Sequence, residues 1–96
     1  FQRNAKTAIG VAQAAGVAIA LAGIRGIEVV QYTAQEVKMA VTGYGAAAKS
    51  QVQAMVARHC HLTEVPEPPD AADALGLAVT HLMNIRTMRR MTAVTL

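Results

Sequence analysis

The chain has 96 residues, which is enough for one small domain and too few for two. Hydrophobic residues make up 53% of it and charged residues 16%, which excludes an intrinsically disordered chain outside its ends. The one cysteine, Cys60, excludes an internal disulfide framework and indicates a reducing compartment. The few aromatic residues, Phe1, Tyr32 and Tyr44, exclude a base-stacking platform. Because Phe1 rather than Met comes first, we expect a processed chain, a trimmed chain or a fragment.

The formal net charge is +3, and the charges are unevenly distributed. Residues 74–96 contain three arginines and no acid, whereas residues 64–73 contain four acids and no base. A basic body with one compact acidic cluster favours contact with a polyanion together with a local cation site. The same charges also suit a mildly basic, solvated surface. The acidic cluster consists of Glu64, Glu67, Asp70 and Asp73.

Residues 4–23 are predicted to form one helix that is apolar nearly all round and therefore buried on most sides. The segment from Thr7 to Ile24 carries no charge, and its length is at the short edge for a membrane span. It is rich in Ala and Gly and contains Gln13, so we interpret it as a core helix of a soluble protein. Gly23 and Gly26 are typical of its C-terminal end.

Residues 27–32, with the sequence IEVVQY, are the one convincing strand in the chain. A single strand cannot stand alone, because its backbone donors and acceptors need neighbours. Two interpretations follow. Either the segment is an extended linker in an all-helical protein, or the rest of a sheet lies in sequence outside this chain; the non-Met start favours the second.

A second helix is predicted to begin after Thr33, which has the spacing of a capping box with Glu36. It runs to about residue 41 and stops at Gly43. A Gly-rich turn over residues 42–45 leads into a third helix at about residues 46–59.

After a Pro-rich loop, Pro69 fits the first position of a fourth helix, over about residues 69–84. This helix is apolar on most faces, so we expect its body to be buried. Residues 85–96 lack a core-forming pattern, and we expect a loose basic tail there.

Asp70 and Asp73 are the first candidate site residues. They lie three residues apart near a helix start, so their carboxylates share one face and can hold a hard divalent ion. Asp is also common in first turns, where it caps the helix and opposes the helix dipole. A complete metal site needs further ligands, and the sequence does not place Glu64 and Glu67, which lie on the Pro-rich loop.

Lys49 is the second candidate. It falls in the first turn of its helix behind a Gly-rich turn, where free N–H groups and an ammonium would converge on an anion such as phosphate. A flexible surface lysine is the alternative. Residues 43–50 resemble a P-loop only superficially, because Ala48 replaces the required glycine and a helix precedes the turn. Lys38 by itself is typical of a solvated surface residue.

The three histidines carry no recognisable metal or nucleophile motif. In His59-Cys60-His61 adjacent side chains point in different directions and no spaced partner pair exists, which argues against a metal cluster. His81 lies about 16 Å along the helix axis from Asp70, too far to share one ion with it, so we expect a core-edge histidine.

Taken together, the motifs resemble the bacterial RuvC family of Holliday junction resolvases. The resemblance covers about residues 1–84 and rests on the order and spacing of four elements. These are Gln13–Val17 in the first helix, Glu36–Lys38, the run VTGYGAAAKSQV at 41–52, and DAADAL at 70–75 followed by AVTH at 78–81.

The resemblance implies an α/β, RNase H-like fold with a mixed sheet flanked by helices, of which this chain holds only the C-terminal half. Residues 1–84 would be the C-terminal portion of a single nuclease domain, and residues 85–96 a basic tail. The family resolves four-way DNA junctions in recombination and repair, as a homodimer in the bacterial cytoplasm. It uses Mg²⁺, with Mn²⁺ as a substitute, and works with the branch-migration complex RuvA–RuvB.

The resemblance also implies roles for individual residues. Asp70 and Asp73 correspond to the last two of four acidic residues that form the family's catalytic metal site. Lys38 and Lys49 match lysines implicated in DNA contact or catalysis, and we assign Lys49 to both roles. Phe1 lies at or next to an aromatic residue that touches the junction bases, with the register uncertain by one residue.

The first two acidic residues of the family precede Phe1 and are absent from this chain. We therefore expect half an active site and no cleavage by the isolated chain. The leading hypothesis is a structure-selective endonuclease. The alternatives are a non-catalytic DNA-binding or assembly fragment of the same fold, and a helical interaction module without a role in nucleic-acid binding.

Overall fold

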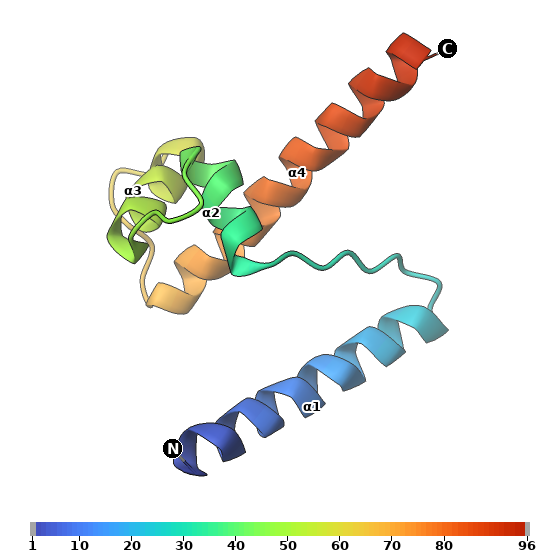
Figure 1. Cartoon of the computed structure of the whole chain (residues 1–96), viewed down its shortest axis with the longest axis vertical. Helices are drawn as coiled ribbons and strands as arrows, with labels where there is room; N and C mark the ends of the chain where they lie inside the picture. The colour runs from blue at the N-terminus through green and yellow to red at the C-terminus, as the bar shows by residue number, and fades with distance from the viewer. Residues whose placement is uncertain (1, 96) are drawn as a thin grey trace. The chain divides into compact units, whose positions relative to one another are not determined.

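The computed structural model describes the backbone of residues 2–95 and the side chains of residues 5–90. Over these residues the chain forms four helices, shown in Figure 1, and it divides into two compact units between Gln31 and Tyr32. The helices are α1 (Gln2–Ile24), α2 (Ala34–Thr42), α3 (Lys49–His59) and α4 (Pro69–Thr95).

The first unit consists of α1 and the extended segment that follows it. The helix ends in a Schellman motif, in which the N–H of Ile27 donates to the carbonyl of Ala22 and the N–H of Gly26 to that of Gly23. Gly26 has a φ of 69°, in the left-handed region that glycine adopts without a steric penalty. The sequence signal for this helix end is confirmed.

Residues 27–32 do not pair as a strand within the described part of this chain, so both interpretations of the segment stay predictions. These residues are extended, but no strand occurs within residues 2–95, so the expected mixed sheet is not confirmed. A strand is defined by hydrogen bonds to a neighbour, and β-branched residues alone cannot supply one.

The expectation that α1 is buried is also wrong for this chain. Its apolar side chains are exposed, with Val11 at 65%, Val17 at 61% and Ile24 at 81%. The first unit contains a single helix, so nothing within that unit can cover them. By length and composition alone, the stretch Ala5–Ile24 would suffice to cross a membrane, a test that core helices of soluble proteins also pass.

The second unit is built from α2, α3 and α4, each of which packs against the other two. The capping box that begins α2 is confirmed, because the Glu36 N–H donates to Thr33 Oγ1 at 3.1 Å and the Thr33 N–H donates to Glu36 Oε1 at 3.1 Å. Gly43 ends the helix with a φ of 80° and donates its N–H to the Met39 carbonyl.

The core of this unit is small and lies where the three helices meet. A methyl group at Gly76 would stand 3.4 Å from Val56 Cγ2 and 3.5 Å from Val37 Cγ1, so the glycine lets α4 approach both neighbours closely. The buried hydroxyl of Thr80 donates to the Gly76 carbonyl at 2.8 Å, which satisfies it. The other buried side chains are Val41, Ala47, Val56, Ala57 and Ala72.

Two helix bounds differ from those predicted. Helix α3 begins at Lys49 rather than near residue 46, because the N–H of Ala47 is used in a turn closed by the Tyr44 carbonyl. Helix α4 begins at Pro69 as predicted but continues to Thr95, so the loose conformation expected for the tail is wrong over residues 85–95, and residue 96 lies outside the described residues. That stretch contains no Gly or Pro, and Arg and Met propagate a helix that has already begun. The proposed end of the domain at residue 84 stays a prediction.

Candidate active site

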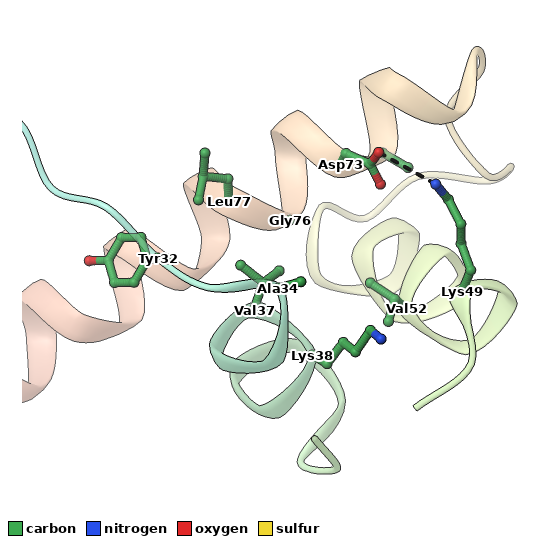
Figure 2. A pocket seen from close by; sticks show the side chains of 10 residues that line it. Tyr32, Ala34, Val37, Lys38, Lys49, Val52, Asp73, Gly76 and Leu77 are labelled. Carbon is green, nitrogen blue, oxygen red and sulfur yellow. Dashed lines mark ion pairs between the residues drawn. The ribbon is translucent and has the colours of Figure 1, made fainter. Parts of the chain in front are cut away.

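A pocket of about 430 Å³ lies in the second unit, between α2, α3 and α4. Its wall is mostly apolar, and Val37, Val52 and Leu77 contribute to it. The polar side chains around it are few: Tyr32 before α2, Lys38 on α2, Lys49 on α3 and Asp73 on α4 (Figure 2). An apolar hollow with a few convergent polar groups is the usual form of a binding site.

The structure brings Lys49 and Asp73 together. Lys49 is the first residue of α3 and Asp73 lies in the second turn of α4, and Lys49 Nζ is 3.5 Å from Asp73 Oδ2. The side chains are 63% and 55% exposed, so the pair is solvated and contributes less than about 1 kcal/mol. An ion pair this weak can exchange, which leaves Lys49 available to an entering anion and Asp73 to an entering cation.

Lys38 lies on α2 and lines the same pocket. It is half-buried, and it forms no ion pair among the described side chains. The pocket therefore carries two ammonium groups and one carboxylate, and its net positive charge suits an anionic group such as a phosphate. The sequence identifies Lys38, Lys49 and Asp73 as separate candidates, and the structure places all three around this one pocket.

Asp70 does not line this pocket. It is exposed in the first turn of α4, and its spacing of three residues places it one turn from Asp73 on a shared helix face. No group of three or more His, Cys, Asp or Glu side chains that could hold a metal ion occurs within the described part of the chain. Two carboxylates nevertheless fit Mg²⁺, which is commonly bound by one or two carboxylates, waters and substrate phosphates.

The remaining singled-out residues lie elsewhere. His59 Nε2 is 3.0 Å from the Val41 carbonyl oxygen, which ties the end of α3 to α2. Glu64 and Glu67 are exposed on the loop before α4, and Glu67 precedes a cis peptide bond to Pro68. Phe1 lies outside the described residues.

Sequence reasoning missed the pairing of Tyr32 with His81. The Tyr32 hydroxyl is 2.8 Å from His81 Nδ1, and the two rings meet edge to face with centroids 5.9 Å apart. This contact ties the residue before the α2 cap to the middle of α4, and Tyr32 also lines the pocket. The two residues are 49 positions apart, so no local pattern could have revealed the pair.

Comparison with known proteins gives a consistent result. The family model for crossover junction endodeoxyribonuclease RuvC matches residues 1–81. The RuvC protein of Leifsonia xyli is 58% identical over 80 residues, which cover 83% of this chain and 38% of that protein. The RuvC protein of Salinispora arenicola is 54% identical over 93 residues, which cover 96% of this chain and 53% of that protein.

The solved structure of Thermus thermophilus RuvC aligns with a TM-score of 0.74 and 39% identity, over 80% of this chain and 46% of that one. The fold is therefore that of the corresponding part of RuvC, an RNase H-like protein. The chain spans about half the length of the curated relatives it matches. On the family model and these identities, the chain belongs to the RuvC family of crossover junction endodeoxyribonucleases.

Proposed function

We propose that the intact protein is a structure-selective endonuclease that resolves four-way DNA junctions by hydrolysing phosphodiester bonds. The observation that carries the proposal is the convergence of Lys38, Lys49 and Asp73 on one pocket in a chain of the RuvC family. The relatives' shared description as crossover junction endodeoxyribonucleases supports the same activity.

The lysines bind and orient the substrate. Lys38 and Lys49 come from two different helices, so a backbone phosphate at the pocket would be held from two sides. Such contacts are independent of base sequence and position the DNA rather than read it. Lys49 moves from the Asp73 carboxylate to the phosphate, and the carboxylate becomes free.

Asp73 and Asp70 are the residues that would hold Mg²⁺, or Mn²⁺ in its place. Their carboxylates supply the hard oxygen ligands that these ions prefer. A bound divalent ion supplies Lewis acidity and an activated water for hydrolysis of a phosphodiester. The Asp70 carboxylate, the freed Asp73 carboxylate and the approaching phosphate would form part of a ligand set that the family's other two acidic residues complete.

Within the RuvC family the catalytic centre contains four acidic residues, and this chain supplies the last two. We therefore expect the isolated 96-residue chain to be inactive. We also propose that the intact protein acts as a homodimer, since two-fold symmetry matches a junction cut on two strands. A bacterial cytoplasmic location and a RuvA–RuvB partner complex belong to the same proposal.

The test is cleavage of a synthetic four-way junction by the intact protein with Mg²⁺. The variants are Asp70→Asn and, as a control, Glu64→Gln, which removes a carboxylate that does not line the pocket. We expect symmetric cuts by the parent and the control, and junction binding without cleavage by Asp70→Asn. Cleavage by Asp70→Asn at the parent rate would mean that Asp70 is not a metal ligand and only stabilises the start of α4.

A second candidate function is a DNA-binding or assembly protein without catalytic activity. The observation that favours it is that Lys38 and Lys49 line the pocket and would hold a DNA phosphate without a metal ion. If the intact parent binds junctions but does not cut them under any divalent ion, this candidate replaces the endonuclease.

A further inference from the structure

The C-terminal half of α4 continues beyond the three-helix core as a single projecting helix, which Figure 1 shows in red. Three arginines lie along its described part, and no acidic residue follows Asp73. We call residues 85–90 the arginine arm. Its arginines are Arg86, Arg89 and Arg90.

The arm's charges are not used within the described structure. All three arginines are exposed, and the one ion pair among the described side chains joins Lys49 and Asp73. An Arg side chain presents five N–H donors in a planar fork and stays charged at any physiological pH. These donors are therefore free for an external anion.

The spacing gathers the charges on one side of the helix. Arg86 lies three and four residues before Arg89 and Arg90, so the three guanidinium groups share one face. With a rise of 1.5 Å and a turn of 100° per residue, this face begins about 20 Å along the helix from Asp73 and lies on roughly the opposite side of α4. A polyanion that reaches both the pocket and the arm must span at least that length.

The arm lies outside the segment that the family model describes, which ends at residue 81. The pocket residues Lys38, Lys49 and Asp73 all lie within that segment. The arginine arm therefore lies beyond the residues that the family model matches, and the family assignment does not itself account for its charge.

We propose that the arginine arm binds the phosphate backbone of one duplex arm of the junction, at a distance from the pocket. This proposal rests on the proposed function. Duplex DNA fits because its phosphates repeat every 3.4 Å along each strand, so several can meet a face that carries three exposed guanidinium groups.

The test compares the intact protein with the triple variant R86Q/R89Q/R90Q, and uses R86K/R89K/R90K as a control that keeps charge and helix propensity. Junction affinity is measured over a range of salt concentrations by fluorescence anisotropy. Each lost phosphate contact reduces the slope of log K against log salt by about 0.9, so we expect the Gln variant to be shallower by up to about 2.7. The Lys control should keep most of the parent's slope.

The length of the junction arms gives a second, independent measurement. Junctions with arms of about 20 base pairs reach the arginine arm, and junctions with arms of about four base pairs do not, since they extend less than 20 Å. We expect the parent to lose at least tenfold in affinity on the short junction, and the Gln variant to bind both junctions alike.

The outcomes separate this proposal from the function on which it rests. If the parent binds and cuts junctions and the Gln variant keeps both the parent's salt slope and its dependence on arm length, the arginine arm does not contact DNA and the proposal is wrong. In that case the anion that the arginine arm binds would be an acidic protein surface rather than DNA. If the parent itself does not bind junctions, the proposed function fails, and this proposal with it.

Discussion

The two units of the chain differ in whether an apolar composition predicts that the side chains are buried. Helix α1 is the most apolar stretch of the sequence, yet Val17 on it is 61% exposed. The second unit contains most of the charged residues, yet Val56 on α3 is fully buried at 0% exposure. Burial depends on neighbouring surfaces as well as on apolar side chains. Three helices that meet at one point provide such surfaces, and a single helix does not.

The largest effect that tests this difference is expected when an Asp replaces a Val in each unit of the 96-residue chain. Val56→Asp places a carboxylate in the core of the second unit, and we expect a loss of about 4 kcal/mol or more in the free energy of unfolding. Val17→Asp, the matched change on exposed α1, should cost less than about 0.5 kcal/mol. Urea denaturation followed by circular dichroism measures both. Equal losses would contradict the difference.

A smaller effect is expected at the start of α2. Thr33→Ala removes the hydroxyl that accepts from the Glu36 N–H, and we expect a loss of about 1 kcal/mol in the stability of the second unit. The control is Thr63→Ala on the exposed loop, which should change little. A loss at Thr63 as large as that at Thr33 would show that the cap does not stabilise this unit.

The contact between Tyr32 and His81 should contribute a similar or smaller amount. Tyr32→Phe keeps the aromatic ring but removes the hydroxyl 2.8 Å from His81 Nδ1, so we expect a loss of about 0.5–1.5 kcal/mol. Tyr44→Phe is a matched control, because Tyr44 is 61% exposed. Thermal unfolding of both variants measures the difference in stability. If Tyr32→Phe is as stable as the parent, the contact with His81 does not help to hold the start of α2 against α4.

The smallest effect on stability is expected at the pocket. Lys49→Gln breaks the solvated ion pair with Asp73, which should lower stability by less than about 1 kcal/mol and by even less at high salt. In the intact protein the same change should strongly weaken junction cleavage. A large loss of stability would mean that Lys49 has a structural role rather than a functional one.

Local features of the fold could be predicted from the sequence, and relations between distant residues could not. The capping box of Thr33 and Glu36, the left-handed Gly43 and the start of α4 at Pro69 each depend on residues within one turn. The extended segment at 27–32 carries strand composition without a partner, and no local pattern reveals whether a partner is present.

The candidate site shows the same limit. Asp73 and Lys49 could be singled out by their positions near helix starts, but their 3.5 Å approach depends on how α3 packs on α4. Their roles, and that of Asp70, came from resemblance to the RuvC family rather than from spacing. The continuation of α4 to Thr95 could not be predicted from a core-forming pattern, because residues without an apolar face to bury can still extend a helix that has already begun.

The most direct measurement is single-turnover cleavage of a four-way junction by the intact protein and by its Asp73→Asn variant, with junction binding measured in parallel. We predict that Asp73→Asn binds the junction as tightly as the parent and cuts it at least a hundredfold more slowly. Cleavage by Asp73→Asn at the parent rate would contradict the assignment of the pocket between α2, α3 and α4 as part of a nuclease active site.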